Sequence, residues 1–195
     1  MTTHRQRQPK RWWNRFWAGD PDRTARRQAA HRLYCDLVNQ SRLSAFYAGL
    51  GVPDTPEGRF EMIGLHVALL VRRLRDNGSA GAALAQELFD LMFADLDANL
   101  RELGVGDLSV GKQVKRLARN FYARLRTLDE VMGGSDLKAL KRMLRNNVYH
   151  GGETPSETQV AALSAYLVAL EQHLAKVPAG GLLEGRLSFP APPLL

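Results

Sequence analysis

The chain has 195 residues, 45% of them apolar, and its single cysteine excludes an internal disulfide bond. This length allows one ordinary domain whose core needs no metal or disulfide, and the composition excludes wholesale disorder. The net charge of +7 comes from residues 1–32, where nine Lys and Arg accompany two acids, so the remaining residues are formally neutral. This asymmetry indicates an N-terminal arm that contacts an anionic surface, either lipid headgroups or nucleic acid.

No segment is expected to cross a membrane. The longest uncharged, mainly apolar run is Met62–Val71, whereas a membrane-spanning helix needs about 20 residues. The N-terminus also lacks the apolar core and cleavage site of a secretory signal. We therefore expect a soluble chain that is not secreted.

The first half of the chain predicts two helices. From residue 23 to residue 48, apolar or small residues recur at three- and four-residue spacing, which is typical of an amphipathic helix. Thr55 followed by Pro56 predicts an N-cap with proline at the first helical position. The helix that follows runs to about Asp76 and is apolar around most of its circumference, so we expect it at the centre of the core.

Four more helices follow, separated mainly by glycine-containing breaks: residues 80–103, 109–131, 135–149 and 156–176. Ser109 is the expected N-cap of the second of these. No segment alternates apolar and polar residues as a half-buried strand does. The predicted fold class is all-α: a single compact bundle of about six helices (23–177), preceded by a basic aromatic arm (1–22) and followed by an extended Gly/Pro-rich tail (178–195).

The residue patterns do not predict an enzyme. The five histidines are scattered without the spacing of a zinc site. His66 lies between two apolar residues of the central helix, which favours a core histidine with a satisfied hydrogen bond over a ligand or catalytic base. Cys35 lies near the buried edge of its predicted helix, which favours an inert thiol. We predict no catalytic residue, no metal and no cofactor.

The N-terminal arm combines aromatic and basic residues: Arg11, Trp12, Trp13, Arg15, Phe16 and Trp17. On a helix the aromatic side chains would gather on one face, with the arginines at its side. Tryptophan favours the boundary between headgroups and acyl chains, and arginine favours an anionic leaflet. The pattern therefore favours a membrane-binding arm. Packing of the aromatics on the domain, or stacking on RNA, are the alternatives.

The fourth predicted helix has a basic side opposite its apolar stripe: Lys112, Lys115, Arg116, Arg119 and Arg126. Such a run is most simply a solvated face. The alternative is a docking surface for an acidic partner or for lipid.

Five segments carry a resemblance to known proteins: GVPDTPEGRFEM (51–62), MFADLDANLRELGVGD (92–107), VGKQVK (110–115), FYAR (121–124) and RNNVY (145–149). Each segment is short, but their order and spacing are similar to those of the ubiquinol–cytochrome c chaperone family. The resemblance covers roughly residues 30–175 and suggests a bacterial-type member. The aromatic arm lies outside it.

The resemblance implies a non-catalytic assembly chaperone that binds cytochrome b, or another cytochrome bc complex subunit, while ubiquinol–cytochrome c reductase is built at the membrane surface. Mitochondrial members act near the ribosome with a small partner protein, so both are further expected partners, whereas DNA is not. The expected location is cytoplasmic, peripheral on the inner face of the inner membrane, or the mitochondrial matrix in a eukaryote. The alternative is an RNA- or ribosome-associated helical protein that uses its basic arm.

The polar residues that match the family pattern form the predicted client-binding set: Arg59, Glu61, Asp95, Asn99, Arg101, Glu102 and Asp107. Asn99 and Asp107 could equally cap helices or tie turns.

Overall fold

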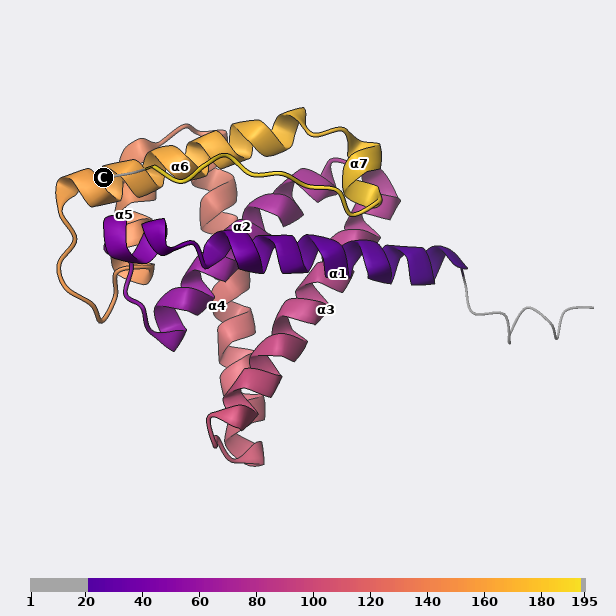
Figure 1. Ribbon diagram of the computed structural model, residues 1–195, viewed down its shortest axis with the longest axis horizontal. Helices are drawn as coiled ribbons and strands as arrows, with labels where there is room; N and C mark the ends of the chain where they lie inside the picture. The colour runs from indigo at the N-terminus through magenta and orange to yellow at the C-terminus, as the bar shows by residue number, and fades with distance from the viewer. Residues whose placement is uncertain (1–20, 194–195) are drawn as a thin grey trace, which may run out of the picture.

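The computed structural model describes residues 21–193, and within this range the chain forms helices and no strand (Figure 1). The helices in chain order are α1 (Pro21–Ser41), the short π-helix η2 (Ala45–Gly49), α2 (Pro56–Arg75), α3 (Gly78–Glu102), α4 (Asp107–Gly133), α5 (Leu137–Asn147), α6 (Glu157–Lys176) and α7 (Ala179–Leu183). The predicted all-α class is confirmed. No helix in this part of the chain is both long enough and apolar enough to cross a bilayer.

Helix α2 is the centre of the molecule, as its sequence predicts. Every residue from Met62 to Val71 is buried, and the helix packs against α1, α3, α4 and α6. Its start also follows the prediction, because the Thr55 Oγ1 accepts a hydrogen bond of 3.1 Å from the Gly58 amide and Pro56 occupies the first turn.

Helices α3 and α4 form an antiparallel hairpin that extends away from the other helices (Figure 1). Aromatic rings hold the two helices together: Phe121 of α4 lies 5.7 Å from Phe89 and 6.1 Å from Phe93 of α3, measured between ring centroids. The outer half of α3 is thereby presented as a wall beside α1 and α2.

The C-terminal tail packs on the bundle. Leu182 of α7 is completely buried, although this segment was predicted to be extended. The chain then runs back along α6 without regular secondary structure (Figure 1). The Gln40 Nε2 donates to the Pro190 carbonyl oxygen at 3.2 Å, so the end of the tail is joined to α1.

Three sequence predictions are wrong in detail. The helix predicted over 23–48 ends at Ser41, whose hydroxyl donates to the Val38 carbonyl oxygen at 2.9 Å, and the chain resumes as η2. Ser109 lies inside the first turn of α4, where Gly106 is the N-cap. Cys35 is exposed, because α1 packs only one face on the core and this residue lies outside that face.

Candidate functional site

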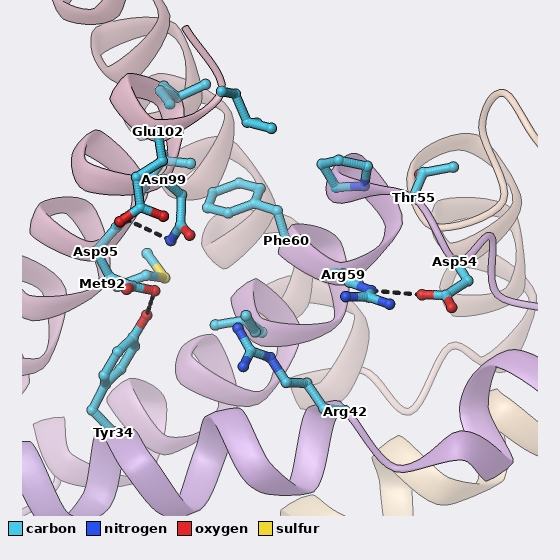
Figure 2. A pocket seen from close by; sticks show the side chains of 15 residues that line it. Tyr34, Arg42, Asp54, Thr55, Arg59, Phe60, Met92, Asp95, Asn99 and Glu102 are labelled. Atoms are coloured by element: carbon cyan, nitrogen blue, oxygen red, sulfur yellow. Dashed lines mark hydrogen bonds and ion pairs between the residues drawn. The ribbon is translucent and has the colours of Figure 1, made fainter.

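A groove of about 670 Å³ opens between α1, the first turns of α2 and the second half of α3 (Figure 2). Its apolar lining comes from α2 and α3: Pro56, Phe60, Ile63, Met92, Leu96, Leu100 and Leu103. Its polar lining comes from all three helices and the segment before α2: Tyr34, Arg42, Asp54, Thr55, Arg59, Asp95, Asn99 and Glu102. The groove therefore offers an apolar surface bordered by charged groups.

Helical spacing explains how these side chains come together. On α3, Met92, Leu96, Asn99 and Leu103 follow one another at intervals of four, three and four residues, so they share one face. On α2, Phe60 reaches from the second turn toward α3 (Figure 2). The two helices thus form opposite walls.

The α1 side of the groove is tied to α3 by one polar contact. The Tyr34 hydroxyl donates to the Asp95 Oδ2 at 2.8 Å. Burial raises the pKa of this tyrosine, and the hydrogen bond to Asp95 raises it further, so the hydroxyl remains a donor at neutral pH. Asn99 is fixed one turn away, where its Nδ2 donates to the Asp95 backbone oxygen at 2.7 Å.

The guanidinium groups of the groove differ in their pairing. Arg59 makes an ion pair of 2.6 Å with Asp54, and its hydrogen bond lowers the pKa of that exposed carboxyl. Arg42 makes no ion pair or side-chain hydrogen bond with any residue in the described range 21–193. Arg42, Asp54 and Arg59 also line a second hollow of about 520 Å³ near Tyr47. Arg42 therefore stands, unpaired within that range, where the two hollows meet.

The structure brings four of the seven predicted client-binding residues into the groove: Arg59, Asp95, Asn99 and Glu102. Their predicted role stays a prediction, since geometry alone does not test binding.

The other three predicted client-binding residues lie elsewhere. Arg101 pairs with Asp97, one turn earlier on α3, and with Asp107 across the turn between α3 and α4; the second pair is the turn-tying alternative for Asp107. Glu61 pairs with Arg124 of α4, and both side chains are largely buried. These residues support the groove wall and do not line it.

Sequence reasoning missed the α1 side of the groove. Tyr34 was assigned only to the apolar pattern of its helix, and Arg42 was placed inside a helix that in fact ends before it. No glycine or proline marks that end, so nothing in the local sequence pointed to Arg42. On the α3 side the sequence did offer a signal, an apolar residue directly before a turn glycine: this residue is Leu103, and in the structure it is 66% exposed.

The remaining candidates fall into two groups. The five residues predicted as a basic docking face on α4 are all exposed: Lys112, Lys115, Arg116, Arg119 and Arg126. The aromatic arm residues, Arg11, Trp12, Trp13, Arg15, Phe16 and Trp17, lie outside the described residues. Within residues 21–193, no group of three or more His, Cys, Asp or Glu side chains is placed to hold a metal ion.

Fold and groove together define an all-helical protein with an open groove lined by apolar and charged side chains. The chain belongs to the ubiquinol-cytochrome C chaperone family, whose family model matches residues 48–189. Its fold is similar to the crystal structure of the Cbp3 homolog from Brucella abortus, with a TM-score of 0.79, 35% sequence identity, and coverage of 88% of this chain and 93% of that one.

Curated relatives of the chain are assembly factors. Ubiquinol-cytochrome c reductase complex assembly factor 1 of Mus musculus is 28% identical over 102 residues, which are 52% of this chain and 35% of the mouse protein. The Xenopus laevis protein of the same name is 24% identical over 118 residues, which are 60% of this chain and 59% of the frog protein. The matches thus span between about a third and three fifths of these relatives.

Proposed function

We propose that this protein is a non-catalytic assembly chaperone that binds cytochrome b while ubiquinol–cytochrome c reductase is built at the membrane surface. Membership of the chaperone family supports the class of activity, and relatives named as assembly factors of this reductase complex support the identity of the assembly. The observation that carries the proposal is the open groove between α1, α2 and α3.

The chemistry of the groove suits a membrane-protein segment that is not yet packed. Such a segment exposes apolar side chains next to polar loop residues. Burying one large apolar side chain contributes about 1.5–3 kcal/mol, so contacts with Phe60, Leu100 and Leu103 would hold a client reversibly. Arg42 would add recognition of an acidic client side chain, because its charge has no partner within the described range.

Affinity capture from detergent-solubilised membranes tests the groove. We expect Leu103→Glu combined with Arg42→Glu to lower the recovery of cytochrome b at least about tenfold, since each 1.4 kcal/mol lost is a factor of ten. Leu137→Glu combined with Arg142→Glu on α5 is the matched control with the same change of charge, because Leu137 is exposed to a similar degree as Leu103, 53% against 66%, and neither Leu137 nor Arg142 lines the groove.

Equal recovery by the groove variant and the control would refute the groove as the client site. If a different subunit of the reductase complex is recovered, that subunit and not cytochrome b is the client, and the groove remains the client site.

A further inference from the structure

The basic stripe is the basic side of α4, formed by Lys112, Lys115, Arg116, Arg119 and Arg126. Among the residues that the structure describes it has no counter-charge. None of the five side chains makes an ion pair or hydrogen bond with another residue in the range 21–193. No acidic residue occurs between Asp107 and Asp129. The stripe extends over about 21 Å of helix at a rise of about 1.5 Å per residue.

Most other arginines of this fold are used internally. All five arginines of α2 and α3 have a partner in the described structure: Arg59, Arg72, Arg73, Arg75 and Arg101. On α4 itself, Arg124 points inward and pairs with Glu61. The unpaired cations of the stripe are therefore not a general property of this arginine-rich chain, although Lys138, Lys141 and Arg142 form a smaller unpaired set on α5 in the described range.

The stripe has an energetic cost that an external anion would remove. Lys112, Lys115, Arg116 and Arg119 repeat at three- and four-residue spacing, where like charges destabilise a helix by a few tenths of a kcal/mol per pair. Without nearby acids this repulsion is uncompensated within the described chain. An anionic surface along the helix would convert it into attraction.

The shape of the stripe favours lipid over RNA. Single-stranded RNA is bound in basic grooves with aromatic stacking platforms, but none of the five cations lines either hollow described above. They stand on the outer side of a projecting hairpin, on flexible stems that suit a planar surface. Beside them Tyr122 is 48% exposed, with its ring packed 5.1 Å from Phe89. A tyrosine, with an apolar ring and a polar hydroxyl group at its tip, suits the headgroup region of a bilayer.

We propose that the basic stripe of α4 docks the protein on an anionic lipid surface, with Tyr122 at the headgroup boundary. This inference deepens the proposed function, because a chaperone of a membrane subunit must hold its groove next to the bilayer. The occupant is the headgroup layer of an anionic leaflet.

Sedimentation of the full chain with vesicles tests the proposal. Phosphatidylcholine vesicles with and without phosphatidylglycerol are compared for two matched variants. The stripe variant is Lys112→Gln, Lys115→Gln and Arg119→Gln. The control is Lys138→Gln, Lys141→Gln and Arg142→Gln on α5, which removes the same residue types, also without ion pairs in the described range.

We expect the stripe variant to partition onto anionic vesicles on the order of 100-fold more weakly, from the usual contribution of a basic residue near such a surface. The control should change far less. The difference should persist when Trp12, Trp13, Phe16 and Trp17 are replaced by Ala in both proteins, which separates the stripe from the arm.

Equal losses by stripe variant and control, or no loss, would overturn the proposal. So would a stripe variant that loses affinity for oligouridylate while keeping its vesicle binding. Capture of cytochrome b in detergent should be unaffected by the stripe variant. If that capture fails for the unaltered chain while the vesicle result holds, the client assignment is wrong and the lipid surface stands.

Discussion

His66 is completely buried, yet both nitrogens of its ring have a partner. Its Nδ1 lies 2.7 Å from the Met62 carbonyl oxygen, which can only accept, so Nδ1 carries the proton. Its Nε2, at 2.9 Å, accepts from the Tyr166 hydroxyl, which in turn accepts from the Gln40 Nε2 at 2.9 Å. This chain of hydrogen bonds fixes the neutral imidazole and links α1, α2 and α6.

The neutral state of His66 predicts an acid-sensitive fold. Burial lowers the pKa of His66 to about 4, although its hydrogen bond to Met62 opposes the shift. Between about pH 6.5 and pH 4 the unfolded chain therefore binds a proton that the folded chain does not. The free energy of unfolding should fall by on the order of 3 kcal/mol as the pH drops through this window. Urea unfolding at several pH values measures it.

The variant His66→Gln isolates this contribution. The substitution lowers the free energy of unfolding at neutral pH, but glutamine binds no proton in this pH range. The free energy of unfolding of the variant should therefore decrease less between pH 6.5 and pH 4 than that of the natural chain. Parallel pH profiles of the two proteins would show that His66 does not cause the acid sensitivity.

At the residue scale, sequence reasoning was successful where the environment is local. His66 was predicted as a satisfied core histidine because Leu65 and Val67 flank it on an apolar helix. Its partner Tyr166 lies 100 residues further along the chain, so no local pattern could identify it. Cys35 was misplaced because its burial depends on which face of α1 meets α3, and neighbouring helices decide that.

Among the helices, α2 and α4 are joined by the ion pair between Glu61 and Arg124. The two side chains are only 14% and 9% exposed. Burial raises the pKa of Glu61, whereas the Arg124 charge and hydrogen bond lower it. The pair therefore supports the α3–α4 hairpin from behind the groove only while both charges are present.

Removal of one partner should be far more harmful than removal of both. Arg124→Met leaves the Glu61 carboxylate buried without a counter-charge, and should cost about 3–5 kcal/mol of unfolding free energy at neutral pH. Adding Glu61→Gln should restore most of that loss. Urea unfolding of the two single variants and the double variant measures the coupling. Additive losses would mean that the two side chains do not interact in solution.

Helix positions were predictable, but their ends were less so. Apolar spacing located all six long helices, because each must bury one face. The end of α1 at Ser41 was missed, since no glycine or proline marks it; a side-chain contact closes it instead, the hydrogen bond of 2.8 Å from the Tyr47 hydroxyl to the Ser41 carbonyl oxygen. The cap of α4 was misjudged because a serine near a helix start resembles an N-cap wherever it stands.

At the scale of the whole molecule, the groove joins segments that are distant in sequence. The contact between Tyr34 and Asp95 spans 61 residues. The family resemblance led to the α3 side, where Asp95, Asn99 and Glu102 lie in one matching segment. Nothing comparable marked Arg42, so the α1 side required the fold.

The C-terminal tail closes the bundle at a point where only glycine fits. Gly185 has a φ of +76°, and a Cβ at this position would lie 2.8 Å from the Ala29 Cα and 2.9 Å from the Ala29 carbonyl oxygen of α1. Gly104, in the turn between α3 and α4, has nearly the same φ of +78° with no atom within 4 Å of such a Cβ. Both glycines therefore adopt a left-handed backbone conformation, but only Gly185 is packed closely against another helix.

Alanine substitutions at Gly104 and Gly185 separate the cost of backbone strain from the cost of disturbing the packing of the tail. Gly104→Ala should cost about 1–2 kcal/mol, the usual penalty of a left-handed conformation for a residue with a Cβ. Gly185→Ala should cost about 1–3 kcal/mol more, because the Cβ must displace the α1 backbone as an overpacked side chain does. Urea unfolding of the two variants measures the difference. Equal costs would mean that the tail lifts off α1 without loss, and that the bundle is stable without it.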